Sequence, residues 1–371
     1  MKHSINYRFW LRTDRSLFYG AEQYVVSAVS AINSSSTKIS ADLAYLSLGS
    51  RQAFAPFLVF FRLLALALAN NKPEEAILDV FQFPFFPPFC RRSKLPTTII
   101  CFHHADLING TPLSRFTELA GLLFLMLYKK DVRLVCVSRY WLSWLNAKGF
   151  NNVTLILNPI SNRLAQLAHH QLHDLVNSCS NGQNIPGLSI APEQLNIYLG
   201  IARKAKGWLR LAPVVRTLFP SANIFVSSPN RLETIGSADS SFAEKYQVSV
   251  RYFADPEDLY LFLTTMQICI FASEFREGWN RTLLEASILC NGLTFALSEG
   301  GMQNVAELAP WIMAFGKHRT LYKELRSISC VEGLTKQINA SIDAKAKHLS
   351  CTIDVLSISR FVHSWELLAY E

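Results

Sequence analysis

Two glutamates and the residues between them are the part of the sequence best suited to bind a polar ligand. Glu277 lies in a polar loop that follows the apolar run 268–271, and Glu285 lies eight residues later inside a helical pattern. Ligands of open α/β sheets bind at the carboxyl ends of the strands, so a site is expected in this loop. Carboxylates placed there can accept hydrogen bonds from hydroxyl groups.

The residues around these carboxylates favour an anion site. Gly278 permits close approach of the backbone to a ligand, and Asn280 is a favourable N-cap residue. The amides that begin the following helix, near Arg281, have no intrahelical acceptor and would point toward a negative group. One carboxylate could then face a sugar while the other reaches a ribose. The alternative is structural, because an acidic residue near a helix start stabilises the helix without any ligand.

Alternating strand and helix patterns must position that loop, and the sequence has two series of them. Short β-branched and aromatic runs alternate with longer helical patterns, which is typical of parallel strands joined by crossover helices. We therefore expect an α/β protein with two Rossmann-like, doubly wound domains. The expected strands are 5–11, 39–48, 76–81, 97–102, 133–137, 153–157, 195–199, 223–226, 248–252, 268–271 and 293–297. The expected helices are 22–32, 57–69, 115–129, 139–148, 208–218, 256–266, 281–290 and 357–368.

A change in composition marks the expected boundary between the two domains. Residues 174–194 are rich in Asn, Ser and Gly and have no clear periodicity, so we place the linker there. The first domain then spans residues 1–173 and the second spans residues 195–350. Residues 351–371 contain an apolar-periodic helix that could return to the first domain.

The string Glu-Gly-Trp-Asn-Arg-Thr-Leu-Leu-Glu-Ala at 277–286, followed by Gly300 and Gly301, resembles the Glu-x7-Glu motif and glycine loop of family 4 glycosyltransferases. These are retaining enzymes of the GT-B fold, in which two Rossmann-like domains face a cleft. The resemblance implies transfer of a sugar from a nucleoside-diphosphate-sugar to a hydroxyl group of a glycan or lipid-linked acceptor. It also implies that Glu277 acts in catalysis by orienting the sugar.

A loop of the second domain is similar to the family's Gly-Arg-x4-Lys-Gly sequence. The segment 200–207 keeps Lys206 and Gly207 but has Ile201 at the usual arginine position, so the resemblance assigns that role to Arg203. Fixed positive charge at this point would stabilise a leaving diphosphate. The expected donor-binding residues are Arg203, Lys206, Gly278, Asn280, Arg281, Glu285, Gly300 and Gly301.

The first domain carries the expected acceptor side of the site. Gly20 and Glu22 resemble the family's glycine turn after the first strand, with Tyr19 in place of the first glycine. His103 and His104 follow the strand 97–102, where the family has a histidine that faces the acceptor. The resemblance implies a catalytic role for one of them, with His103 favoured.

Charge is unevenly distributed along the chain. Residues 1–170 contain 18 Lys and Arg against 9 Asp and Glu, whereas residues 171–371 contain 18 against 19. With the aromatic run 80–89 and the basic residues Arg91, Arg92 and Lys94, this favours contact with an anionic membrane surface, where a lipid-linked or lipopolysaccharide acceptor would lie. The alternatives are a solvated basic face and core packing of the aromatic run. Nucleic acid is not an expected partner, because no nucleic-acid-binding motif accompanies the charge.

The remaining sequence features concern location and cofactors. The eight cysteines are at least eleven residues apart and several lie in apolar runs, which is typical of reduced core residues in a cytoplasmic protein. Neither a signal peptide nor a membrane-spanning run is expected, although peripheral binding at the inner face of a membrane is consistent with the sequence. The resemblance requires no metal and no cofactor beyond the nucleotide-sugar. The departures at Tyr19 and Ile201 keep two alternatives open, a non-catalytic GT-B nucleotide-sugar-binding protein and a GT-B nucleotide-sugar epimerase.

Overall fold

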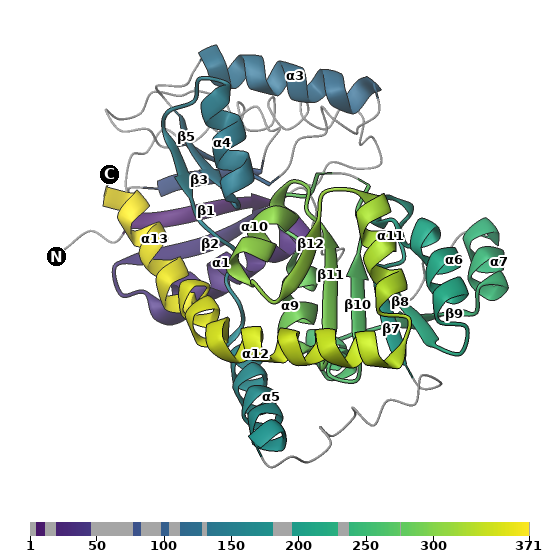
Figure 1. The fold of residues 1–371 in the computed structure, drawn as a ribbon. Coiled ribbons are helices and arrows are strands. Elements are labelled where there is room, and N and C mark those ends of the chain that lie inside the picture. Colours follow the sequence, from purple (N-terminus) through teal and green to yellow (C-terminus); the bar gives the residue numbers. More distant parts are fainter. Residues whose placement is uncertain are drawn as a thin grey trace. The chain divides into compact units, whose positions relative to one another are not determined.

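Two parallel β-sheets, each flanked by helices, form the framework of the chain (Figure 1). The computed structural model describes residues 5–11, 20–45, 77–82, 98–103, 112–127, 132–180, 195–228, 237–274 and 276–370. The chain divides into two compact units. The first consists of Met1–Pro159 with Leu356–Glu371, and the second of Ile160–Val355.

The described strands of the first unit form one six-stranded sheet in the order β2-β1-β3-β4-β5-β6. All neighbouring strands are parallel, which confirms the expected doubly wound α/β class. Each expected strand is present within three residues of its expected ends, whereas the expected helix 57–69 lies outside the described residues. The elements of this unit are β1 (Ile5–Leu11), α1 (Gly20–Ser35), β2 (Ile39–Tyr45), β3 (Ile77–Gln82), β4 (Thr98–Phe102), α3 (Pro112–Leu127), β5 (Val132–Cys136), α4 (Arg139–Ala147), β6 (Val153–Leu155) and α13 (Ile358–Tyr370).

The two faces of this sheet are covered by different helices. Phe81 of β3 and Phe102 of β4 belong to one buried cluster that also contains Leu122 and Leu125 of α3 and Trp141 of α4. Because side chains alternate along a strand, the neighbours of these two phenylalanines point to the opposite face. That face is covered by α1 and α13.

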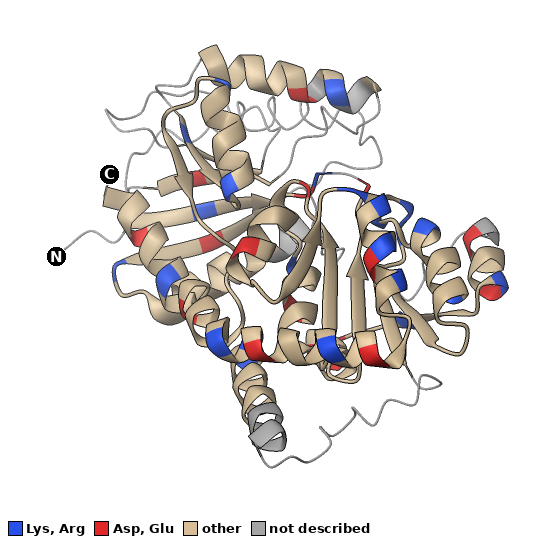
Figure 2. Ribbon diagram, in the orientation of Figure 1, with Lys and Arg blue, Asp and Glu red and all other residues tan. Residues whose placement is uncertain are grey.

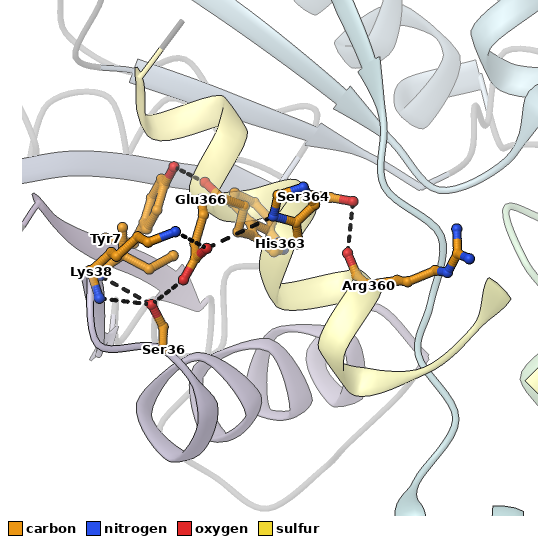
Figure 3. A network of polar contacts seen from close by, with 9 residues as sticks. Tyr7, Ser36, Lys38, Arg360, His363, Ser364 and Glu366 are labelled. Atoms are coloured by element: carbon orange, nitrogen blue, oxygen red, sulfur yellow. Dashed lines mark hydrogen bonds and ion pairs between the residues drawn. The ribbon is translucent and has the colours of Figure 1, made fainter. Parts of the chain in front are cut away.

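The C-terminal helix α13 is anchored on the first unit by one buried aromatic residue. Trp365 is fully buried, and its ring lies 5.2 Å from the rings of both Tyr7 and Phe9 on β1. The Tyr7 hydroxyl donates a 2.8 Å hydrogen bond to the carbonyl oxygen of Trp365 (Figure 3). Glu366 accepts hydrogen bonds from Ser36 and Lys38 at the rim of the same contact. The bond from Ser36 is the main reason that the pKa of Glu366 is lowered.

Replacing Trp365 with alanine should destabilise the first unit by about 3–5 kcal/mol, because it leaves a large cavity between α13 and β1. The matched control is Leu367→Ala, since Leu367 is about half exposed on the same helix. Urea unfolding followed by circular dichroism measures both variants. Equal stabilities of the two variants would show that α13 is not anchored through Trp365.

The described strands of the second unit form a second six-stranded sheet in the order β12-β11-β10-β7-β8-β9, again parallel throughout. Its expected strands and helices are present, and the sequence missed β12 and several helices. The elements are α5 (Asn162–Ser180), β7 (Asn196–Ile201), the 3-10 helix η3 (Lys204–Lys206), α6 (Trp208–Leu218), β8 (Asn223–Ser228), α7 (Ser237–Lys245), β9 (Val248–Tyr252), α8 (Pro256–Leu263), β10 (Ile268–Phe271), α9 (Arg281–Leu289), β11 (Leu293–Leu297), α10 (Gly301–Leu308), β12 (Ile312–Phe315), α11 (His318–Ser327) and α12 (Val331–Val355).

Helix α5 lies across the predicted linker, so the predicted boundary differs from the observed one. The sequence assigned residues 160–173 to the first domain and 174–194 to a linker, but residues 162–180 form one helix of the second unit. Gln171 on this helix donates hydrogen bonds to the carbonyl of Leu289 and the side chain of Asn291. Asn and Ser cost little inside a helix, so the polar composition did not end it. Residues 181–194 lie outside the described residues.

The long helix α12 carries a buried lysine. Lys345 is 3% exposed, and its ammonium group donates to the carbonyl oxygens of Ile288 at 3.1 Å and Cys290 at 2.8 Å, at the end of α9. Burial lowers the pKa of Lys345 to about 8. The exposed part of α12 carries charges of both signs (Figure 2), in keeping with the near-neutral second half of the sequence.

The stability of the second unit should therefore depend on pH through Lys345. Between about pH 8 and pH 10.5 the unfolded chain holds a proton at this lysine that the folded chain has released, so its contribution to the free energy of unfolding rises with pH. We expect the stability of the wild type to rise relative to Lys345→Met over this interval, by up to about 1.4 kcal/mol per pH unit. Urea unfolding at half-unit pH steps measures this difference.

The control for the pH experiment is Lys347→Met, which removes an exposed lysine of the same helix. Its stability should follow the wild type in parallel across the whole interval. Parallel curves for Lys345→Met as well would mean that Lys345 titrates as an ordinary lysine in the folded chain.

Among the described residues, no helix is both long enough and apolar enough to cross a bilayer. The predicted membrane-binding run lies mostly outside the described residues, which include only 80–82 of it. Eleven of the 18 Lys and Arg residues of the basic first half also lie outside them. Membrane contact therefore stays a prediction.

Candidate functional site

The carboxyl ends of β7, β10 and β11 bring most of the predicted donor residues of the second unit together. In this sheet β7 lies between β10 and β8, so the chain adds strands to one side of β7 first and then to the other. Such a reversal is the topological switch point at which open α/β sheets bind ligands. Lys206 follows β7, Glu277 follows β10, and Gly300 and Gly301 follow β11.

A partly buried ion pair lies at this switch point. The ammonium of Lys206 is 2.7 Å from Oε2 of Glu277, and the Glu277 side chain is only 5% exposed. Asn280 donates to Oε1 of the same carboxylate at 3.0 Å, and Ser273 donates to that oxygen as well. The carboxylate is therefore held in one orientation by groups from two loops. Ser273 is a site residue that the sequence interpretation missed, although it precedes Glu277 by only four positions.

Three glycines allow the loops to approach closely enough for this pair to form. Gly207 and Gly300 have positive φ angles of 78° and 60°, which favour glycine. A Cβ atom on Gly301 would overlap the carbonyl oxygen of Gly278, and one on Gly207 would overlap the carbonyl oxygen of Ala272.

The backbones of the loops are also hydrogen-bonded directly to one another. The Gly301 amide donates to the carbonyl of Glu277 at 2.7 Å, and the Glu274 amide donates to the carbonyl of Ala205 at 2.8 Å. The loop after β10 is thus fixed from both sides, by the loop after β7 and by the loop after β11.

The start of α9 differs from its expected role as an open anion site. Asn280 is the N-cap residue, as predicted, and its Oδ1 accepts a 2.8 Å hydrogen bond from the amide of Leu283. The expectation that the first amides of this helix are free was therefore wrong for the amide of Leu283, because the cap side chain occupies it. Asn280 has two functions, since its amide nitrogen also holds Glu277.

The second carboxylate of the motif has its own cation. Nε of Arg281 lies 2.7 Å from Oε1 of Glu285, and the hydroxyl of Tyr260 on α8 donates to the same oxygen at 3.3 Å. The carboxylate of Glu285 raises the pKa of Arg281 further, and burial raises the pKa of Tyr260. The side chain of Arg281 is thus paired within α9, and its predicted role in donor binding stays a prediction. Tyr260 was missed because 25 residues separate it from Glu285.

The other predicted residues are placed as follows. Arg203 is half-buried and precedes η3, so it lies in the same loop as Lys206. In the first unit, Gly20 begins α1, and the backbone of Glu22 lies in its first turn. His103 is the first residue after β4, and its ring packs edge-on against the ring of Tyr24 with centroids 4.9 Å apart. His104 lies outside the described residues.

A metal centre is not apparent in the part of the chain that the structure describes, where no three His, Cys, Asp or Glu side chains are grouped to hold an ion. The absence of a metal in the reaction stays a prediction.

Comparison with known proteins identifies the fold. No protein-family model and no curated protein matches the chain. Solved structures do match. Sucrose-phosphate synthase of Thermosynechococcus elongatus is 11% identical with a TM-score of 0.68, and the match covers 99% of this chain and 98% of that one. The Anabaena protein HepE in complex with UDP-glucose is 13% identical with a TM-score of 0.63 and coverages of 99% and 100%.

A third similar structure is WaaG, a glycosyltransferase involved in lipopolysaccharide biosynthesis. It is 14% identical with a TM-score of 0.62, and the match covers 96% of this chain and 98% of that one. The chain therefore has the GT-B fold of these glycosyltransferase structures, as the sequence predicted. At these identities the similarity concerns the fold, so membership of family 4 stays a prediction.

The glycine contacts can be tested without any ligand. Gly301→Ala should lower the free energy of unfolding by about 1–3 kcal/mol, because the added methyl group cannot fit against the Gly278 carbonyl without moving a loop. Gly316→Ala is the control, since nothing lies within 4 Å of a Cβ atom there, and it should change stability by less than about 0.5 kcal/mol. Urea unfolding of both variants checks this. A neutral Gly301→Ala would contradict the close approach.

Proposed function

We propose that the chain is a retaining glycosyltransferase that moves a sugar from a nucleoside-diphosphate-sugar to a hydroxyl group of a glycan or lipid-linked acceptor. The observation that carries the proposal is the partly buried Lys206–Glu277 pair at the switch point of the second sheet. A cation beside an oriented carboxylate suits a ligand that is anionic at one end and hydroxylated at the other. A sugar diphosphate has both properties.

The structural comparisons support the same class of donor. The Anabaena protein of the same fold was crystallised with UDP-glucose, so this fold accommodates a nucleotide-sugar. In our proposal the ammonium of Lys206 and the guanidinium of Arg203, both in the loop after β7, interact with the diphosphate. Gly300 and Gly301 let the backbone come close to the donor, and Glu285 binds the ribose.

The chemical step breaks the bond between the anomeric carbon and the diphosphate oxygen, and the electron pair remains on that oxygen. Negative charge therefore develops on the diphosphate in the transition state, where the fixed cation Lys206 stabilises it. The acceptor hydroxyl attacks from the face that the diphosphate leaves, and its proton passes to the departing oxygen. This course retains the anomeric configuration and requires no metal in our proposal.

Glu277 has a positioning function in this scheme. Three donors hold its carboxylate before any ligand arrives, which fixes the direction from which a sugar hydroxyl can donate to it. Pre-organisation of this kind contributes to catalysis because the group does not have to reorganise during the reaction. His103 in the first unit is the proposed acceptor-side residue.

The acceptor class rests on the sequence and on one comparison. WaaG acts in lipopolysaccharide biosynthesis and shares the fold, and the first half of this chain is strongly basic. We propose a glycan or lipid-linked acceptor at the inner face of a membrane, with the protein in the cytoplasm and bound peripherally to anionic lipid.

The donor site is tested by a thermal-shift panel of UDP-, GDP-, ADP- and dTDP-glucose. A donor present at about 100 times its dissociation constant should stabilise the wild type by about 2.7 kcal/mol, which corresponds to several degrees. Lys206→Ala should abolish that shift, because it removes the cation that contacts the diphosphate. The matched control is Lys204→Ala, which removes an exposed lysine two residues earlier in the same short helix and should keep the shift.

Three outcomes would contradict the proposal in different ways. If no nucleotide-sugar shifts the wild type, there is no donor site. A shift without hydrolysis of the donor or transfer would indicate a non-catalytic nucleotide-sugar-binding protein. Conversion of the donor to an isomeric nucleotide-sugar in the absence of any acceptor would indicate an epimerase.

A further inference from the structure

A buried side-chain amide in the first unit has no hydrogen-bond partner among the described residues. Gln82 is the last residue of β3 and is only 8% exposed, yet neither its amide nitrogen nor its amide oxygen has a hydrogen-bond partner there. Buried polar side chains are hydrogen-bonded in the large majority of cases, and an unsatisfied one lowers stability. This exception therefore needs an explanation.

The strand register places Gln82 on the same face of the sheet as His103. Gln82 is paired with Cys101 of β4, and residues paired in parallel strands point to the same side. His103 follows Cys101 by two positions, so it shares that side. The neighbouring residues Phe81 and Phe102 belong to the core cluster on the opposite face, which agrees with this assignment.

The position of Gln82 in the sheet is one where α/β proteins bind ligands. In the first sheet β1 lies between β2 and β3, so the order of strand addition reverses at β1 and β3. Gln82 is at the carboxyl end of β3, directly at this switch point, and His103 is at the carboxyl end of the next strand. This end of the sheet therefore has the side-chain amide of Gln82, whose nitrogen and oxygen both lack hydrogen-bond partners among the described residues, and the imidazole of His103 at the end of the next strand.

We propose that Gln82 is a substrate-binding residue that hydrogen-bonds hydroxyl groups of the sugar acceptor. A side-chain amide offers one accepting oxygen and two N–H donors, which matches a pair of hydroxyl groups that can each donate and accept. The amide carries no charge, so it suits a neutral polyhydroxylated group better than a diphosphate. The inference rests on the proposed function for the identity of the ligand, because the donor residues of that proposal lie in the second unit.

A stability measurement separates this role from a structural one. Gln82→Met keeps the length of the side chain and removes both unsatisfied polar atoms, so it should raise the melting temperature of the ligand-free protein. The matched control is Gln267→Met, because Gln267 is partly buried but its amide oxygen accepts from the amide of Asn196 and its amide nitrogen donates to the carbonyl of Thr265, so its loss should lower the melting temperature. A lowered melting temperature in Gln82→Met would mean either that the amide has a structural partner or that methionine does not pack there, and a second variant decides between the two.

Because methionine can fail to pack at this position, Gln82→Leu is measured in parallel. A higher melting temperature in either variant supports the proposal. Lower melting temperatures in both variants overturn it.

A binding measurement then tests the class of ligand. The probe is an equimolar mixture of the methyl glycosides of glucose, galactose, mannose and N-acetylglucosamine, and the readout is the thermal shift it produces. The wild type should be shifted at least twice as far as Gln82→Met. Equal shifts in the two proteins, including no shift in either, would overturn the assignment to a sugar.

Donor hydrolysis in the absence of acceptor distinguishes this inference from the proposed function. The rate and KM for the donor should be unchanged within twofold in Gln82→Met, because Gln82 does not contact the donor. A raised donor KM would overturn the acceptor assignment. If the wild type neither binds nor hydrolyses any donor, the proposed function fails, whereas the comparison of melting temperatures still decides whether Gln82 is a ligand-binding residue.

Discussion

Backbone contact at glycine sets how closely the loops after β7, β10 and β11 approach one another, and the rest of the site depends on that distance. Any side chain at Gly207 or Gly301 would overlap a carbonyl oxygen of the neighbouring loop. Without those contacts Lys206 and Glu277, which are 71 residues apart in the sequence, would not meet at 2.7 Å. The glycines are therefore required for two reasons. They permit the backbone conformation of the loops, and they let the ion pair between Lys206 and Glu277 form.

Charged side chains with little exposure in the second unit have polar or charged partners, because removing a charge from water is costly. A buried ion pair seldom adds to stability relative to apolar side chains, so stability alone does not explain why Lys206 and Glu277 lie where they do. The buried Lys345 offers a contrast, because its two carbonyl partners join α12 to the end of α9 and do not belong to a loop at the carboxyl end of a strand. Lys345 thus connects two helices, whereas the partly exposed Lys206 lies at a switch point where a ligand can reach it.

The strands and the loop around Glu277 could be predicted from the sequence because they depend on local patterns. The apolar run 268–271, the following polar loop and the N-cap Asn280 are all visible in the order of residues, and the structure has them as expected. Contacts between distant residues were not visible, such as that between Tyr260 and Glu285. Helix α12 was missed for a related reason, since Lys345 occupies a position in its buried stripe and interrupts the apolar periodicity.

The polar side chains at the two switch points differ in whether they have partners in the ligand-free protein. This difference follows from their charge. A carboxylate as buried as that of Glu277 cannot be left without partners, since the desolvation of an isolated charge costs far more than a folded domain can offset. Lys206, Asn280 and Ser273 therefore hold this carboxylate before an anionic ligand arrives. A neutral amide left without partners costs only about 1–3 kcal/mol, which a domain can tolerate. Gln82 can consequently remain unsatisfied until a neutral, hydroxylated ligand supplies the hydrogen bonds that the described residues do not.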